Sequence, residues 1–288
     1  MTDREKTAGF IGCGKMGGAL AAAASKSGWT VYATDHHPEN TQRLQKECGA
    51  VVSSTEEIAK TCRFIFLGVK PQGMEQTLSE LAPFLAEREP GQAYVIVTMA
   101  AGISMAAVSH VLGNCSVIRI MPNTPAAVGE GVILYCTSNS SAAMARESEC
   151  TRAVAKEEEA AFLELLNPAG MLIKIDESKI DAASAVSGCG PAFVCLFAEA
   201  LVQGAVRCGL SGELAKRLAL QTVYGTAKLA LQTNRDPALL RGDVCSPAGS
   251  TMEGVAVLEE RAVRSAVLEA VTAAYHRTME LGNANTQK

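Results

Sequence analysis

The apolar residues of this 288-residue chain change their spacing near residue 176. Before that point, short β-branched runs alternate with segments of helical period. From Ala182 to Leu281, apolar residues recur only with the 3.6-residue period of helices, and no strand is expected. Strands that alternate with helices predict a parallel sheet covered on both faces, whereas consecutive helices form a layer of their own. We therefore expect an α/β chain with two domains, 1–176 and 177–288.

The expected elements follow from these periods. Strands are expected at Ala8–Ile11, Thr30–Thr34, Arg63–Val69, Tyr94–Thr98, Val117–Met121, Val132–Thr137 and Met171–Ile175. Helices of the first part are expected at Lys15–Ser27, Pro38–Glu47, Thr55–Thr61, Gln72–Leu85, Ser104–Leu112 and around Ala143–Leu166. The second part should hold helices at Phe193–Cys208, Ser211–Gln232 and Arg261–Leu281. With 48% apolar residues, the chain can build a sizeable core.

Composition argues against several function classes. A net charge of −4 and only 5% aromatic residues offer no footprint for a nucleic acid. The ten cysteines include no CxxC pair, so we expect neither a metal site nor a redox pair. The charged N-terminal segment lacks an apolar core, which favours a cytoplasmic protein with free thiols. Glycines and polar residues interrupt the uncharged segment Pro90–Ile118, so we expect no membrane span.

A glycine motif, GCGKMG, joins the first expected strand to the first expected helix. A GxGxxG between a strand and a helix is typical of dinucleotide-binding domains of the Rossmann type. Its glycines permit a tight turn and let the backbone approach a pyrophosphate, which meets free amides at the positive end of the helix dipole. The motif therefore predicts cofactor binding by Gly12, Gly14, Lys15, Met16 and Gly17.

Ligands of an open parallel sheet lie beyond the carboxyl ends of its strands. Asp35 lies there, eighteen residues past Gly17, where a carboxylate usually binds the adenosine ribose. A helix start before Pro38 is the alternative. Further cofactor contacts are expected after three other strands, at Val69, Lys70, Pro71, Ala100, Ala101, Gly102 and Asn123. For Lys70 and Gly102, a solvated side chain and a simple turn are the alternatives.

The same carboxylate bears on which dinucleotide is bound. Asp35 would accept hydrogen bonds from the ribose hydroxyls of NADH but would face the 2′-phosphate of NADPH. Like charges a few ångströms apart cost on the order of a few kcal/mol near a surface. This favours NADH over NADPH, although His36, His37 and Arg43 follow closely and could offset the phosphate.

Two glycine-proline segments mark the second part. Ser187–Pro191 precedes a long apolar helix, and Pro191 suits its first position. The segment Asp243–Thr251 precedes another helix, where Ser250 and Glu253 fit a capping box. The alternative to simple capping is that this helix start binds the carboxylate of a substrate through its backbone amides.

Taken together, these motifs resemble those of pyrroline-5-carboxylate reductases over nearly the whole chain. The resemblance is carried, in order, by GCGKMG, Val69-Lys70-Pro71, Ala100-Ala101-Gly102, Met121-Pro122-Asn123-Thr124-Pro125, Ser187–Pro191 and Asp243–Glu259. The SPxGxT segment with its following helix is the most specific of these. The resemblance implies reduction of a cyclic imino acid to proline by NADPH or NADH. It also implies a helical domain that forms a homodimer, or a larger ring such as a decamer.

The resemblance assigns the substrate site to the segment before the last helices. By position, the Thr251 hydroxyl would reach the ring nitrogen and serve as the catalytic group. The backbone amides of Gly249, Ser250 and Thr251 would bind the carboxylate, and Ser246 would complete the substrate site. Catalysis would need no strong acid, because a protonated imine already accepts a hydride at carbon, and none of the four histidines accompanies a substrate motif.

Lys70 and Asn123 match the cofactor rim of that family, but two other positions depart from its pattern. Ala248 replaces the commoner glycine of an SPGG turn, which would be strained if that position needs a positive φ. Asn234 stands where some members carry an acidic residue near the amine.

Two other functions remain open from the sequence. A 3-hydroxyacid dehydrogenase of the β-hydroxyacid type also begins GxGxMG and needs a lysine on a helix of its second domain, which Lys228 superficially offers. An SPxGxT segment has no place in that family, however, and Lys228 also fits an exposed helix position. The third candidate is a dinucleotide-binding sensor without turnover.

Overall fold

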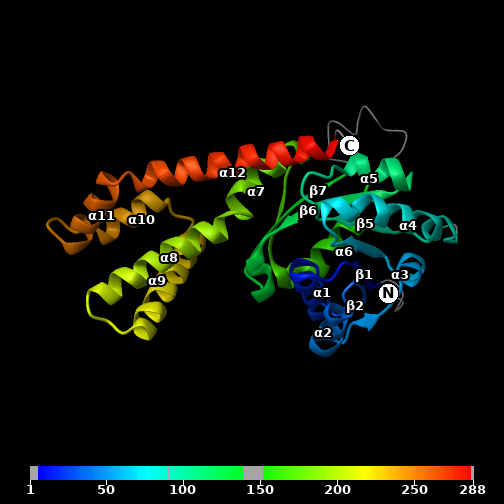
Figure 1. Cartoon of the computed structure of the whole chain (residues 1–288), viewed down its shortest axis with the longest axis horizontal. Coiled ribbons are helices and arrows are strands. Elements are labelled where there is room, and N and C mark those ends of the chain that lie inside the picture. The colour runs from blue at the N-terminus through cyan, green and yellow to red at the C-terminus, as the bar shows by residue number, and fades with distance from the viewer. Residues whose placement is uncertain (1–5, 90, 139–151, 287–288) are drawn as a thin grey trace. The chain divides into compact units, whose positions relative to one another are not determined.

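The computed structural model describes residues 6–89, 91–138 and 152–286, without the side chains of 282–286. Its contacts divide the chain into two compact units (Figure 1). The sheet unit comprises residues 1–188 and 275–288, and the helical unit comprises residues 189–274. The expected boundary at 176 follows the end of the strand pattern. Residues 177–188 stay with the sheet because helix α7 (Ile180–Ser187) packs against strands β6 and β7.

The described residues of the sheet unit form one sheet with the strand order β3-β2-β1-β4-β5-β6-β7-β8. Neighbouring strands are parallel except β6 and β7. The strands are β1 (Thr7–Ile11), β2 (Thr30–Thr34), β3 (Val51–Val52), β4 (Phe64–Leu67), β5 (Val95–Thr98), β6 (Ser116–Pro122), β7 (Gly131–Thr137) and β8 (Gly170–Lys174). The order from β3 to β6 is that of a dinucleotide-binding domain, and it confirms the expected Rossmann-type fold.

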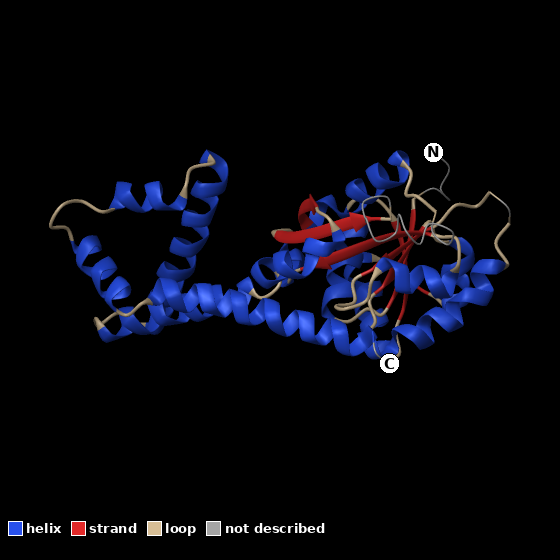
Figure 2. Ribbon diagram, turned by 90° about the horizontal axis from the view of Figure 1, so that it is seen from above, coloured by secondary structure: helices blue, strands red, loops and turns tan. Residues whose placement is uncertain are grey.

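Helices enclose the sheet on both faces (Figure 2). They are α1 (Lys15–Lys26), α2 (Pro38–Cys48), α3 (Thr55–Thr61), α4 (Met74–Ala86), α5 (Met105–Leu112), α6 (Lys156–Leu166) and α7. Successive residues of a strand point to opposite faces, so β5 contributes Val95 and Val97 to one core and Ile96 to the other. The first core lies under α1 and α6, and the second lies under α3, α4 and α5.

Helix α6 starts later than expected. The sequence predicts a helix around Ala143–Leu166, of which 143–151 lie outside the described residues. Residues 152–155 are not helical, and α6 begins at Lys156. The Ser116 and Ser138 hydroxyls donate to the Arg152 carbonyl, and the Arg152 N–H donates to the Cys115 carbonyl. These bonds hold Arg152 beside the start of β6 and the end of β7. The helix therefore begins only after this residue.

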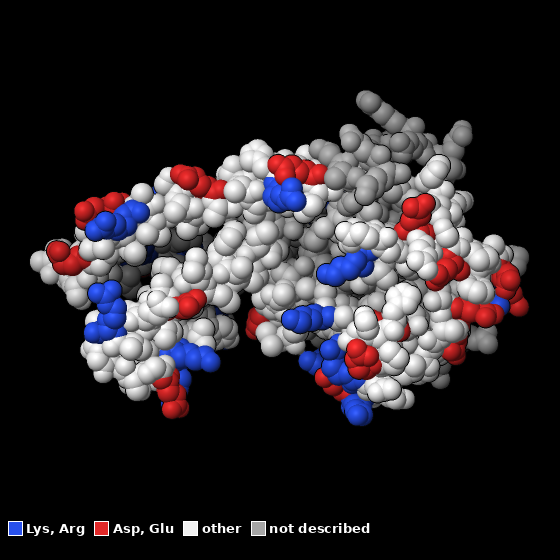
Figure 3. Space-filling view, in the orientation of Figure 1, with Lys and Arg blue, Asp and Glu red and all other residues white. Residues whose placement is uncertain are grey.

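The helical unit consists of α8 (Gly190–Arg207), α9 (Gly212–Thr233), α10 (Pro237–Val244), α11 (Ser250–Glu260) and the first half of α12 (Val263–Thr286). The expected long helices are present, and α10 is an addition. Within this unit, the large exposed apolar side chains are Val194, Leu196, Phe197, Leu201, Val206, Leu210, Leu214, Leu218, Leu220, Tyr224, Leu229, Leu231, Leu239, Val244, Met252, Val257, Leu258, Val267 and Leu268. Uncharged side chains cover much of the face seen in Figure 3.

One stretch of the described chain, residues 177–207, is long and apolar enough to cross a membrane when judged by length and composition alone. In the structure it is not one continuous helix. Helix α7 ends at Ser187 and α8 begins at Gly190. The same apolar composition would also suit helices that are covered by another protein chain.

Candidate active site

A cleft of about 590 Å³ lies beyond the carboxyl ends of β1, β2 and β4. Its size is that of a small-molecule site. It is lined by Ile11, Gly12, Gly14, Thr34, Asp35, His36, His37, Asn40, Thr55, Gly68, Val69, Lys70, Gly73, Gln76, Thr77 and Glu80. The structure thus brings together five of the predicted cofactor residues: Gly12, Gly14, Asp35, Val69 and Lys70.

The glycine loop owes its shape to a close approach of two strand ends. Gly12 has φ +93°, and a Cβ there would lie 2.7–2.9 Å from backbone atoms of Gly68 and Val69. A Cβ on Gly17 would lie 2.2 Å from the Gly12 carbonyl oxygen. Gly14 differs, because a Cβ there would meet no protein atom within 4 Å. Gly12 and Gly17 therefore serve packing, whereas the bare backbone of Gly14 leaves cleft space that suits a pyrophosphate.

Helix α1 begins beside this space without a side-chain cap. Its N-cap is Gly14, which makes no side-chain capping bond. The first amides of the helix are therefore available to an anion at the positive end of the dipole. Lys15 and Met16 do not line the cleft; they line a neighbouring groove of about 400 Å³ with Arg43.

Asp35 is one of the two carboxylates that line the cleft. Its Oδ2 accepts a hydrogen bond from the Cys13 N–H at 2.5 Å, and its Oδ1 accepts one from the His37 N–H at 2.8 Å. Partial burial pushes the pKa of Asp35 upward, but these two bonds and the Asn40 side chain outweigh it and lower the pKa below its ordinary value. The carboxylate is therefore ionised and fixed, and it serves both the start of α2 and the cleft.

The Arg43 guanidinium is bound by groups other than Asp35. Arg43 Nη2 donates to the Cys13 carbonyl oxygen at 3.1 Å, and its Nε lies 3.8 Å from Glu47 Oε2. Burial, followed by the charge of Asp35, raises the pKa of the Cys13 thiol to about 12. This thiol is therefore neutral and unreactive at physiological pH.

The remaining predicted cofactor residues lie at the same edge of the sheet but do not line the cleft. Pro71 opens a short 3₁₀ turn, and Ala100, Ala101 and Gly102 (φ +74°) form the loop after β5. Asn123 is almost fully buried at the end of β6. Its Nδ2 donates to the Ser187 carbonyl at 2.9 Å, and its Oδ1 accepts from the Val132 N–H at 2.8 Å. Their contact with a cofactor stays a prediction.

Sequence reasoning missed the wall that α4 contributes to the cleft. Gln76 and Glu80 lie one helical turn apart and are joined by a bond from Gln76 Nε2 to Glu80 Oε1 of 2.8 Å. Their i, i+4 spacing in the helix that follows Lys70 could have predicted this wall, because such residues share one face of a helix. Among the described residues, no group of three or more His, Cys, Asp or Glu could hold a metal ion.

The predicted substrate residues lie together in the helical unit, in the turn that leads into α11. The Gly249 N–H donates to the Ser246 carbonyl at 3.0 Å, and a Cβ on Gly249 would lie 2.5 Å from Ser246 Oγ. Ala248 has φ +58°, which confirms the expected strain. Ser250 and Thr251 are exposed in the first turn of the helix.

The capping box expected at Ser250 is wrong. The N-cap is Gly249, one residue earlier, because that residue has the extended backbone that precedes the helix (φ −80°, ψ 156°). No side chain caps this end. The first amides of α11 therefore have no side-chain acceptor, as a carboxylate-binding helix start requires. Asn234 takes a left-handed conformation (φ 50°) at the end of α9.

Comparisons with known proteins cover nearly the whole chain. Residues 177–281 match the family model for pyrroline-5-carboxylate reductase dimerisation, and residues 7–102 match that of coenzyme F420-dependent NADP oxidoreductases. A pyrroline-5-carboxylate reductase of Synechocystis is 36% identical over 95% of this chain and 97% of its own. Pyrroline-5-carboxylate reductase 3 of Macaca fascicularis is 34% identical over 95% of both chains. The crystal structure of the Plasmodium falciparum pyrroline carboxylate reductase with NADP bound has a TM-score of 0.79 and 29% identity, and covers 96% of this chain and 99% of its own.

Proposed function

Because this chain belongs to the pyrroline-5-carboxylate reductase family, we infer that it reduces 1-pyrroline-5-carboxylate to L-proline, the last step of proline biosynthesis. The observation that carries this function is the pairing of two sites in one chain. One is a dinucleotide cleft built on Gly12, Gly14 and Asp35, and the other is an uncapped helix start at Gly249–Thr251. Relatives of this name span 95% of the chain at 34–36% identity.

The residues divide the work between binding and orientation. When bound, the dinucleotide supplies the hydride. The glycine loop and the first amides of α1 hold its pyrophosphate, and the loops that follow β4, β5 and β6 border it. The amides of Ser250 and Thr251 bind the substrate carboxylate, with Ser246 beside them; the predicted Gly249 amide is instead bonded to the Ser246 carbonyl. The Thr251 hydroxyl oxygen accepts a hydrogen bond from the protonated ring nitrogen and so fixes the imine for attack.

The preferred dinucleotide in this proposal is NADH. Support comes from the Asp35 carboxylate, which is ionised, held by two backbone N–H groups and directed at the cleft. Further support comes from Arg43, whose guanidinium is bound to the Cys13 carbonyl. His36, His37 and Lys70 also line the cleft and are the groups there that would favour a 2′-phosphate.

Replacing Asp35 with Ser tests the cofactor preference. Removing the carboxylate should raise the kcat/KM ratio of NADPH over NADH by about tenfold or more, because repulsion of the phosphate is relieved. Glu80→Gln is the matched control, since Glu80 lines the same cleft and its carboxylate accepts a hydrogen bond from Gln76 on its own helix. A wild type that already prefers NADPH, with no change in Asp35→Ser, would leave Asp35 as a helix-starting residue only.

The proposal includes a homodimer, with a larger ring such as a decamer as a further step of assembly. The exposed apolar faces of α8 and α9 and the dimerisation model over residues 177–281 support subunit contact through the helical unit. It also includes a cytoplasmic location, which agrees with the free cysteines among the described residues.

Steady-state assays test the activity itself. NADH or NADPH oxidation should depend on added 1-pyrroline-5-carboxylate. The same preparation should leave 3-hydroxyisobutyrate unoxidised in the presence of NAD⁺. Turnover of the hydroxyacid would instead indicate a β-hydroxyacid dehydrogenase. Dinucleotide binding without turnover of either substrate would indicate a sensor.

A further inference from the structure

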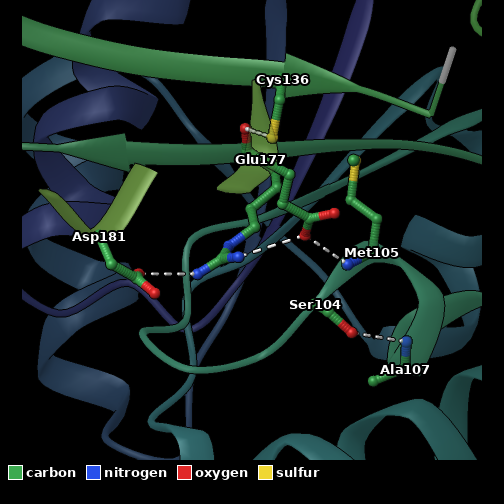
Figure 4. Close-up of polar contacts among 7 residues, drawn as sticks. Ser104, Met105, Ala107, Cys136, Glu177 and Asp181 are labelled. Atoms are coloured by element: carbon green, nitrogen blue, oxygen red, sulfur yellow. Dashed lines mark hydrogen bonds and ion pairs between the residues drawn. The ribbon is translucent and has the colours of Figure 1, made fainter. Parts of the chain in front are cut away.

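One buried arginine connects three segments that are distant in the sequence. Arg119 in the middle of β6 is 5% exposed. Its Nη1 lies 3.2 Å from Glu177 Oε1 and its Nη2 lies 3.4 Å from Asp181 Oδ1 (Figure 4). Glu177 Oε1 also accepts a hydrogen bond from the Met105 N–H at 2.9 Å. The cluster therefore joins β6 to the start of α5 and to the start of α7.

The segments that meet at Arg119 carry residues of the predicted site. The loop with Ala100, Ala101 and Gly102 leads into α5, whose N-cap Ser104 accepts the Ala107 N–H at 3.1 Å. Glu177 holds the next residue of this start, Met105. The Arg119 cluster thus fixes the far end of a loop that is expected to border the cofactor.

Helix α7 is held at its start by a residue of β6 and at its end by the residue that follows β6. Arg119 binds Asp181 near its start, and Asn123 Nδ2 donates to the carbonyl of Ser187, its last residue. Helix α7 is also the last element of the sheet unit before the helical unit begins at Cys189. Arg119 in β6 and Asn123 directly after β6 therefore anchor α7, the last helix of the sheet unit.

The composition of the cluster argues against a role in stability alone. Burying a charged arginine with two partly buried carboxylates is costly, and well-packed apolar residues often replace such clusters without loss of stability. Arg119 Nε has no hydrogen-bond partner, and neither has the buried Thr98 Oγ1 on the residue paired with Arg119 in β5. Incomplete pairing makes the cluster less stabilising still. The planar guanidinium of Arg119 instead fixes the positions of the two carboxylates that it binds.

We propose that Arg119 is a positioning residue for hydride transfer. Through Glu177 it fixes the start of α5 and so the loop after β5, and through Asp181 it fixes α7, both relative to β6. This inference rests on the proposed reductase function. In the proposed role Arg119 contacts neither substrate nor cofactor and acts through Glu177 and Asp181. The cleft beyond β1, β2 and β4 is lined by other residues, so the affinity for the dinucleotide should not depend on Arg119.

Arg119→Lys tests the proposal, because lysine keeps the charge but cannot hold both carboxylates as a fork. A small misplacement of reacting groups costs up to about a hundredfold in rate. We expect kcat to fall about 10–100-fold, while the Kd of NADH, measured by fluorescence titration, changes less than about twofold. The primary isotope effect with 4-deuterated NADH should rise, since hydride transfer becomes slower relative to other steps.

Two Glu177 variants separate the bond from the charge. Glu177→Gln keeps an oxygen that accepts from the Met105 N–H and should retain most of the rate. Glu177→Ala removes it, and should lower kcat as Arg119→Lys does and speed hydrogen exchange at the Met105 amide. Arg152→Lys is the control: it weakens another arginine–carboxylate pair of the sheet unit, with Glu158 at 2.6 Å, and should leave the isotope effect unchanged.

The proposal is overturned if Arg119→Lys keeps the wild-type kcat and isotope effect, or if its loss is fully explained by a smaller fraction of active sites. Should Arg119→Lys fail to fold, equal rates in Glu177→Ala and Glu177→Gln overturn it, and the expected difference supports it. If the wild type is inactive toward 1-pyrroline-5-carboxylate, the proposed function is refuted instead. The variant tests require an active wild type.

Discussion

In the sheet unit, Phe10, Phe64 and Phe66 are fully buried, whereas the three buried residues of the helical unit are all alanines, Ala198, Ala215 and Ala219. The sheet unit therefore covers its own large apolar side chains between the sheet and its helices. The helical unit leaves most of its leucines and valines exposed within one chain. Apolar area of this extent indicates a surface that another chain covers. One unit covers its own large apolar side chains, and the other exposes the surface through which the proposed dimer would form.

The same contrast holds for the backbone. Every described residue with a left-handed φ in the sheet unit is a glycine, including Gly12 and Gly102. The non-glycine residues in that region, Asn234, Ala248 and Ala262, all belong to the helical unit. Glycine takes this conformation without strain, whereas alanine does so at a cost of about 1–2 kcal/mol. The helical unit thus carries local strain that the sheet unit avoids.

Charged substitutions test the dependence on assembly and should have the largest effect. Phe197→Asp and Leu218→Asp place a carboxylate on surfaces that a partner would cover, where an unpaired charge is costly. We expect monomers in sedimentation velocity at micromolar concentration and loss of nearly all activity. Met171→Asp on β8 is the control of similar exposure in the sheet unit and should stay assembled and active. A folded, active wild-type monomer at submicromolar concentration would contradict this.

Two glycine variants test the completeness of the sheet unit. Gly12→Ala combines a positive φ with a Cβ closer than 3.0 Å to the backbone of Gly68, so unfolding free energy should fall by about 3 kcal/mol or more. Gly14→Ala meets no protein atom and should lose less than about 1 kcal/mol. Its methyl group would occupy the cleft, however, and should weaken NADH binding. Urea unfolding and NADH titration of both variants would separate packing from ligand contact.

Thr251→Val tests the exposed site of the helical unit. Loss of the hydroxyl should cost roughly 1–3 kcal/mol of transition-state stabilisation, or about 5–150-fold in kcat/KM. Because Thr251 is exposed, the melting temperature should hardly change. Thr251→Ser keeps the hydroxyl and should retain most activity. Wild-type kinetics in the valine variant would remove Thr251 from the catalytic assignment.

Ala248→Gly should have the smallest effect, and an opposite one. Relief of the left-handed strain, less the entropy that glycine adds to the unfolded chain, should stabilise the protein by about 0.5–1 kcal/mol. Ala262→Gly, at φ +54° between α11 and α12, should stabilise it similarly. Only the change at 248, beside the substrate amides, should alter the KM for 1-pyrroline-5-carboxylate. No gain in either variant would mean that these turns are not strained.

Local patterns predicted the elements whose cause is local. The alternation of strands and helices located the sheet, and the glycine motif located the loop whose Gly12 and Gly17 have no room for a Cβ. Strand β3 was missed because two exposed valines carry no period. The Arg119 cluster was missed because its partners lie 58 and 62 residues away, where no spacing rule applies. Asn123 was predicted at the cofactor rim, but its bonds to Ser187 and Val132 depend on how β6, β7 and α7 come together.

Among the described residues, 275–286 belong to the sheet unit together with those before residue 189, so this unit is built from two separate stretches of the chain. The helical unit is therefore an insertion that is tethered twice. A chain stopped after Gly188 would lack the end of α12 and would not reproduce the intact dinucleotide unit. Excision would require a new connection between 188 and 275. A single proteolytic cut near Cys245 would place the two stretches of the sheet unit on different fragments.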